Sequence, residues 1–260
     1  MLIDTHCHLN SEELINNIDS HLNDAENVGV GIFIVIGWDK ESSFKAVELA
    51  NKYKNIYASV GFHPSDINGV GESDFEEVMN LLNEKKVIAL GEIGLDYYWE
   101  KDLAQREKQK EWFKKQILVA NAYNKPIIIH NREAFEDCLE ILKENNPIAS
   151  GVMHCYSGSV EFLQEVLKTG VLIGLDGPVT YKNAKTPKEV AKIVPLNKLL
   201  LETDCPYLTP HPFRGTLNSP KYLRLIAEEI ANLREIDLSI VENATTENAI
   251  KLFKLWRKYF

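Results

Sequence analysis

The sequence predicts an α/β protein with a (β/α)8 TIM-type barrel, and three observations support this fold class. Short apolar, β-branched runs alternate with longer amphipathic segments. The alternation repeats for eight rounds with a period of roughly 28 residues, which favours repeated βα units. The chain has 260 residues, and a barrel of this kind commonly uses about 250 residues as one domain.

Eight runs are predicted to be strands of one parallel sheet. Each is short and almost continuously apolar, as expected for strands that are buried on both faces. The predicted strands cover residues 2–8, 30–36, 56–61, 87–93, 126–130, 151–154, 171–175 and 198–203.

The segments between these runs have apolar residues at helical spacing. Ser11 is a suitable N-cap for the first helix. The predicted helices cover residues 12–26, two segments that begin at residues 39 and 73, and residues 103–123, 133–144, 160–168, 187–193, 221–233 and 246–258. No Pro/Gly/Ser-rich linker interrupts the series, so we expect one barrel domain over residues 1–260.

Composition excludes several classes of protein. The net charge is −9 and no Lys/Arg-rich run stands out, whereas proteins that coat long nucleic acids carry a basic face. No apolar run approaches the roughly 18 residues needed to span a bilayer. The N-terminus has no basic stretch followed by an apolar run and a small-residue cleavage site. We therefore expect a cytoplasmic protein without a membrane partner.

Residues that commonly bind metals follow the predicted strands. His6 and His8 are two apart, so both imidazoles fall on one face of the first strand. Since the carboxyl ends of barrel strands converge on one rim, residues at the ends of other strands should join them. The candidate metal ligands are His6, His8, Glu92, His130, His154 and Asp204. Each of them alone could instead be a capping or strand-end residue.

Six candidate ligands indicate two divalent metal ions, because one catalytic zinc usually takes three protein ligands. Glu92 can bridge the two ions, as carboxylates do in phosphatases and nucleases with paired metals. Zinc, manganese and magnesium all suit this mixture of imidazoles and carboxylates. His63 follows the third predicted strand and could be a seventh ligand, but we expect it to be a donor that contacts the substrate.

The four cysteines match neither a disulfide framework nor a CxxC zinc site. Three of them, Cys7, Cys155 and Cys205, stand directly beside candidate ligands. Neighbours on a strand point to opposite faces. We therefore expect these three thiols to point outward, toward the helices, and to be reduced.

Taken together, the motifs resemble the TatD family of metal-dependent deoxyribonucleases over nearly the whole chain. Motifs this numerous and ordered are specific. They are residues 4–8 (DTHCH), 60–64 (VGFHP), 91–97 (GEIGLDY), 130–134 (HNREA), 154–158 (HCYSG), 202–208 (ETDCPYL) and 246–249 (TENA).

The resemblance implies a barrel that hydrolyses phosphodiester bonds in DNA in the manner of a 3′–5′ exonuclease, with a water activated by two ions. It implies that Glu92 is shared by both ions. The first ion would take His6, His8 and Asp204, and the second His130 and His154. Asp204 would also accept a proton from the attacking water, so Glu92 and Asp204 are the expected catalytic residues. His63 and Arg214 are the expected substrate-binding residues.

The chain departs from the family pattern after Arg214-Gly215. The family continues with a basic residue and then Asn-Glu-Pro, whereas this chain has TLNSP at residues 216–220. The departure bears on substrate preference and not on the metal site.

Two other functions remain open. Amidohydrolase-type barrels also begin with H-x-H, but many bridge their metals with a modified lysine at the end of the fourth strand. Here Lys85 and Lys86 precede that strand, and Glu92 takes the bridging position. A non-enzymatic protein that retains its ligands is the second alternative. The sequence leaves open whether DNA, RNA or a small phosphodiester is the substrate, whether attack starts from an end of the strand, and whether the protein is a monomer.

Overall fold

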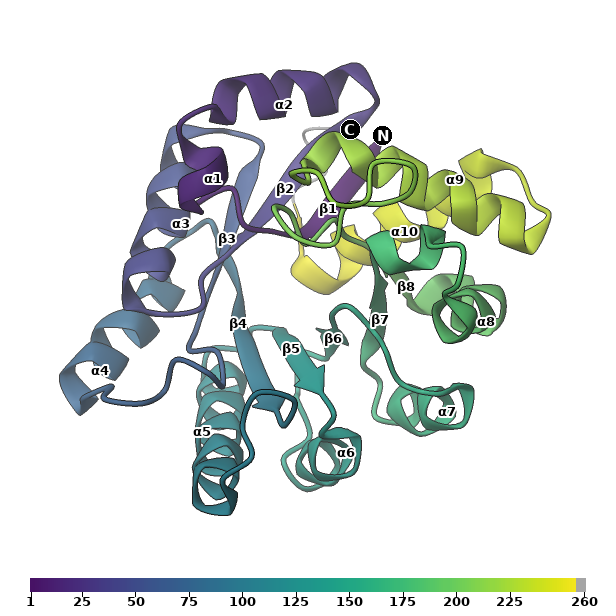
Figure 1. Ribbon diagram of the computed structural model, residues 1–260. Helices are drawn as coiled ribbons and strands as arrows, with labels where there is room; N and C mark the ends of the chain where they lie inside the picture. The colour runs from purple at the N-terminus through teal and green to yellow at the C-terminus, as the bar shows by residue number, and fades with distance from the viewer. Residues whose placement is uncertain (256–260) are drawn as a thin grey trace.

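The computed structural model describes residues 1–255 and has an eight-stranded parallel sheet at its centre. Figure 1 shows the strands arranged in a ring with the helices outside them. The strand order is β1-β2-β3-β4-β5-β6-β7-β8, and each strand pairs in parallel with the next. The predicted fold class, a (β/α)8 barrel, is confirmed.

All eight predicted strands are present. β4 continues three residues further than expected, and β8 ends two residues earlier. The strands are β1 (Leu2–Cys7), β2 (Val30–Ile36), β3 (Ile56–Val60), β4 (Val87–Asp96), β5 (Ile127–Arg132), β6 (Gly151–Met153), β7 (Leu172–Leu175) and β8 (Leu199–Leu201).

The helices also follow the expected order. They are α1 (Glu12–Ile15), α2 (Ile18–Asn27), α3 (Lys40–Lys52), α4 (Glu72–Asn80), α5 (Leu103–Ala122), α6 (Phe135–Glu144), α7 (Val160–Lys168), α8 (Lys185–Ile193), α9 (Leu223–Arg234) and α10 (Leu238–Phe253). Within residues 1–255, no helix is long and apolar enough to cross a membrane.

Two helix predictions were wrong in their bounds. The first helix is split at Asn16 and Asn17, whose side chains compete for backbone hydrogen bonds and lower helix propensity. The last helix begins at Leu238 and not at Thr246. Its first turns contain β-branched residues, and tertiary packing of the buried Val241 outweighs their weak helix propensity. The predicted end at Lys258 lies outside the described residues.

Apolar side chains fill both surfaces of the sheet. A large cluster lies between the strands and the surrounding helices. A smaller cluster contains alternate residues of the strands, such as Ile32, Ile34 and Ile36, together with Leu252 and Phe253 of α10. The side chains of these strands thus fill the barrel as in other TIM barrels, and α10 packs against them. The site therefore has a rigid apolar support.

The barrel is closed between β8 and β1 partly by side chains. Thr203 donates its backbone N–H to Asp4 Oδ1 at 3.0 Å and its hydroxyl to Asp4 Oδ2 at 2.6 Å. Thr5 donates its hydroxyl to the carbonyl oxygen of Leu201 at 2.9 Å. Burial raises the pKa of the Asp4 carboxyl to about 8, although the hydrogen bonds from Thr203 oppose this shift. These buried contacts fix the relative position of the two strands that end in His6 and Asp204.

We predict that Thr203→Val lowers the free energy of unfolding by about 1–3 kcal/mol, because a buried oxygen of Asp4 loses its hydrogen bond. Urea denaturation would measure the change. Thr245→Val is the matched control, since the hydroxyl of Thr245 is buried but bonds only to its own helix, at the carbonyl of Val241. Equal stability of the Thr203→Val variant and the unmodified protein would contradict the role of this contact.

Candidate metal centre

All six predicted ligands lie at the carboxyl rim of the barrel. His6 is in β1 and His8 follows it, Glu92 is in β4 and His130 in β5, and His154 and Asp204 follow β6 and β8. Their side chains are at most 17% exposed. Register shifts in β1 and β4, beside the candidate ligands, show local bulges. Bulges re-aim side chains next to functional sites.

The first group of candidate ligands contains His6, His8 and Asp204. The Nε2 atoms of the two histidines are 3.3 Å apart. Asp204 Oδ1 is 3.2 Å from His8 Nε2 and 3.6 Å from His6 Nε2. Two imidazole nitrogens and a carboxylate oxygen therefore converge on one point. A divalent cation is the partner that satisfies three such lone pairs at once.

Glu92 lies between this group and a second one. Its Oε2 is 3.5 Å from His6 Nε2. Its Oε1 is 2.8 Å from His130 Nδ1 and 2.9 Å from His154 Nε2. The two oxygens of one carboxylate thus face two different sets of imidazoles. This donor set fits divalent metal ions, and zinc, manganese or magnesium would suit its nitrogen and oxygen atoms.

The second nitrogen of His130 is also held. Its Nε2 is 3.1 Å from Asp96 Oδ2, while its Nδ1 faces Glu92. The other oxygen of Asp96 accepts a hydrogen bond from the backbone N–H of Trp99 at 2.9 Å. A carboxylate that accepts from Nε2 leaves the lone pair on Nδ1, which is the nitrogen that faces Glu92. Asp96 therefore orients His130.

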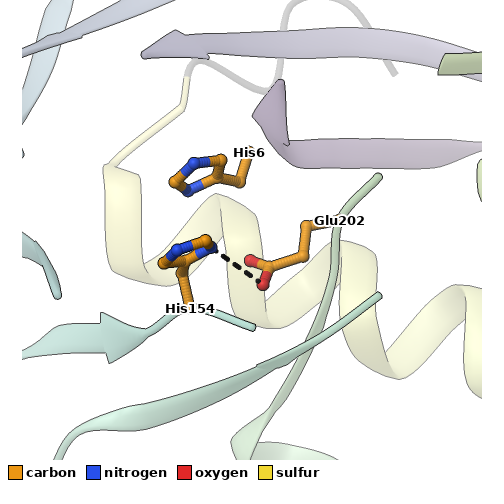
Figure 2. Close-up of side chains that lie close together, drawn as sticks. All are labelled: His6, His154 and Glu202. Atoms are coloured by element: carbon orange, nitrogen blue, oxygen red, sulfur yellow. Dashed lines mark ion pairs between the residues drawn. The ribbon is translucent and has the colours of Figure 1, made fainter. Parts of the chain in front are cut away.

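His154 has an equivalent partner in Glu202. Figure 2 shows the ion pair between them and the ring of His6 lying against that of His154. His154 Nδ1 is 3.5 Å from Glu202 Oε1, and the two rings stack with centroids 3.9 Å apart. The Glu202 carboxylate lies beside Gly174, where an added Cβ would come within 2.4 Å of it. Gly174 thus leaves the space that Glu202 occupies.

The charges of the site depend on one another. Burial alone raises the pKa of the Glu92 carboxyl, but the charge on His154 and hydrogen bonds from three histidines hold it well below its usual range. Burial lowers the pKa of His154, yet Glu92 and Glu202 together raise it well above its usual value. A metal ion at His154 must therefore displace a proton.

All the candidate ligands except the fully buried His6 line a pocket of about 240 Å³ that is open to solvent. Trp38 and Tyr207 form part of its wall. His63, the expected substrate contact, also lines it and lies 3.9 Å from Glu92 Oε1 through Nε2. Arg214 is different: it is exposed, and its guanidinium stacks on Tyr181 at 4.3 Å. Among residues 1–255, Arg214 forms no hydrogen bond or ion pair with any of the six candidate ligands.

The predicted orientation of the cysteines is correct for two of the three. Cys7 and Cys205 are fully buried in the cluster between sheet and helices. Cys155 instead lines a groove at the rim, where burial and the nearby charge of Asp176 raise the pKa of its thiol. β6 ends at Met153 and Cys155 has a φ of 45°, so the alternation of an extended strand no longer applies. All four cysteines are unpaired.

Sequence analysis did not assign roles to Asp96, Glu202 or Asp176. Asp96 could have been found by the argument that selected His6 and His8, because it is four residues after Glu92 on the same strand. Glu202 and Asp204 follow the end of β8 at Leu201, so strand alternation does not relate them. Asp176 follows β7, and the charges of Glu202 and Asp204 add to burial in raising its pKa.

Comparison with known proteins agrees with this site. The family model for the TatD-related DNases matches residues 3–254. The chain is 45% identical to the metal-dependent hydrolase YabD of Bacillus subtilis, over 98% of this chain and all of that protein. It is 35% identical to the metal-dependent hydrolase YcfH of Escherichia coli, over 98% and 96% of the two chains.

Solved structures show the same fold. The crystal structure of YjjV, a TatD homologue from Escherichia coli, superposes with a TM-score of 0.93 and 31% identity, over 98% of both chains. An organophosphorus hydrolase from Deinococcus radiodurans superposes with a TM-score of 0.65 at 14% identity, over 97% and 92%. The second likeness concerns the fold alone.

The (β/α)8 fold and the candidate metal ligands at its carboxyl rim therefore define a metal-dependent hydrolase. The chain belongs to the family of TatD-related DNases.

We predict that Asp96→Asn weakens metal binding about 10–100-fold, the usual effect of removing a partner of a ligand histidine. One amide oxygen cannot accept from both His130 and the Trp99 N–H. Titration of the metal-stripped protein with zinc against a chromophoric chelator would measure it.

Asp137→Asn is the control for this variant, because Asp137 accepts from the hydroxyl of Tyr97 at 2.6 Å and not from a histidine. Unchanged zinc affinity in Asp96→Asn would show that Asp96 does not orient His130.

Proposed function

We propose that the protein hydrolyses phosphodiester bonds in DNA, acting from the 3′ end, with two divalent ions bound at the barrel rim. The observation that carries the proposal is the position of Glu92, whose two carboxylate oxygens face separate groups of imidazoles. Paired ions joined by such a carboxylate recur in nucleases and phosphatases. The family match supports the choice of DNA as substrate.

In this proposal His6, His8, Glu92 and Asp204 hold one ion. Glu92, His130 and His154 hold the other. When bound, the ions would lower the pKa of a nearby water and offset the charge on the phosphate.

The remaining steps belong to side chains of the chain itself. Asp204 lines the pocket with its side chain 12% exposed, so it would be able to accept a proton from water. His63 lines the same pocket and would donate to a phosphate oxygen, where negative charge accumulates in the transition state. Arg214, in an exposed loop, would contact a longer substrate away from the reacting phosphate.

The position of Lys86 argues against the amidohydrolase alternative. Its Nζ donates to the carbonyl oxygens of Ala50, Tyr53 and Ile56, at 2.7, 2.5 and 3.1 Å. These contacts lie before β4, at the end of the barrel opposite to the candidate ligands. Lys86 is therefore unable to bridge ions at the rim, which leaves Glu92 in that position.

We predict that the metal-reconstituted protein cleaves short single-stranded DNA. The assay would compare a DNA oligonucleotide, an unstructured RNA and a chromogenic phosphodiester, each with manganese, magnesium or zinc. A labelled 5′ end would reveal shortening from the 3′ end. Cleavage of a carboxylic ester, lactone or amide, with none of the phosphodiesters cleaved, would contradict the proposal and favour an amidohydrolase.

We predict that Glu92→Gln lowers turnover at least 100-fold without unfolding the barrel, because both ions lose a charged ligand. Metal titration should saturate at two ions per chain in the unmodified protein and below two in the variant. Glu144→Gln is the control, since Glu144 is exposed and pairs with Lys114 on the outer helices. Near-normal turnover of Glu92→Gln, or saturation of the unmodified protein at one ion, would contradict the shared carboxylate.

A further inference from the structure

Two large aromatic side chains are exposed beside the candidate metal centre. Trp99 is 69% exposed and Tyr98 is 40% exposed. Their rings meet edge to face with centroids 4.7 Å apart. They lie in the turn after β4, which carries Glu92 and Asp96. An exposed tryptophan contributes little to the core of the protein, so the ring of Trp99 is available to contact a ligand beside the site.

This turn is held in place relative to the site. Asp96 accepts the backbone N–H of Trp99 through Oδ1 and contacts His130 Nε2 through Oδ2. The Asp96 carboxylate therefore contacts both the backbone of the aromatic turn and His130, a candidate metal ligand. The position of the Trp99 backbone is fixed, whereas its side chain presents a face to solvent.

A cation lies against the same aromatic pair. The guanidinium carbon of Arg132, at the end of β5, is 3.8 Å from the ring centroid of Tyr98 and 5.7 Å from that of Trp99. Within residues 1–255 this guanidinium forms no ion pair or hydrogen bond, so its N–H groups are available to an anion. Lys101 is 5.7 Å from the Tyr98 ring and pairs with Glu133 at 3.5 Å.

One groove connects these residues to the metal centre. It has a volume of about 690 Å³ and is lined by Trp99 and Arg132 as well as by His130, His154 and Asp204. Asn131 also lines it, and this side chain is only 7% exposed. Neither polar atom of the Asn131 amide has a hydrogen-bond partner among the described residues. A buried, unpartnered amide requires a polar partner, which a ligand in the groove would supply.

We propose that Trp99, Asn131 and Arg132 form a subsite that binds one nucleotide of a single-stranded polynucleotide, with its base stacked on Trp99 and its phosphate on Arg132. The proposal rests on the proposed function, because it places the neighbouring phosphate at the metal centre. Bases stack on aromatic side chains of proteins that bind single strands, with arginine contributing nearby. Inside a duplex both faces of a base are covered by the neighbouring base pairs, so the subsite would favour single strands.

Binding to the metal-stripped protein tests the subsite apart from catalysis. Fluorescence anisotropy with labelled oligothymidylate and oligouridylate would measure affinity for DNA and RNA separately. We expect Trp99→Ala to bind about tenfold more weakly and Trp99→Phe to remain within about threefold of the unmodified protein. Arg132→Gln should weaken binding. It should also lower the slope of log affinity against log salt concentration by about one, as expected when one phosphate contact is lost. Ile148→Ala, at a residue 70% exposed and outside the groove, is the control and should bind normally.

A series of oligonucleotides with one abasic position identifies the stacked base. At one position, loss of the base should weaken binding to the unmodified protein about tenfold and leave binding to Trp99→Ala unchanged. Equal affinity of Trp99→Ala and the unmodified protein, while the latter still cleaves DNA, would overturn the subsite alone. If the unmodified protein neither binds nor cleaves single strands, the proposed function fails as well. Melting temperatures of all variants exclude unfolding as the cause.

Discussion

The structure of the site depends on placing one carboxylate, that of Glu92, among histidines in a buried position. Glu92 is only 5% exposed, and an isolated carboxylate there would be strongly disfavoured. Contacts with His6, His130 and His154 offset this cost. Two of these histidines are positioned in turn by acidic residues from other parts of the barrel, His130 by Asp96 and His154 by Glu202. The rim is therefore one network in which each buried polar group depends on its neighbours, and the closed barrel holds all of them at fixed separations.

The same network bears on how an acidic protein would act on the anionic substrate proposed for it. The chain has a net charge of −9, and the site contains Asp96, Asp176 and Glu202 in addition to Glu92 and Asp204. If two divalent ions bind as proposed, their four positive charges would balance much of this acidity without creating a strongly basic surface. Attraction of substrate then depends on short-range contacts in the groove, such as the available guanidinium of Arg132. Long-range steering should be weak.

Much of the fold was determined by sequence pattern alone. The eight apolar runs were identified correctly, because parallel strands buried on both faces need continuous apolar residues. His6 and His8 could be assigned to one face because side chains alternate along a strand, and their Nε2 atoms are 3.3 Å apart. The convergence of His130, His154 and Asp204 followed from the rule that barrel strands present their carboxyl ends at one rim.

Tertiary structure decided which residues far apart in the sequence contact one another, because no local sequence pattern contains this information. Alternation placed Cys155 outside the barrel, but the strand ends before it and the thiol lies at the rim, close enough to Asp176, which follows β7, for that charge to raise its pKa. Likewise the partners of the histidines are 34 and 48 residues away along the chain, at Asp96 for His130 and Glu202 for His154. Sequence determines which face a strand residue occupies, because that depends on the backbone of its own strand. Which residue it meets across the barrel depends on the register and bulges of several strands, which only the closed sheet fixes.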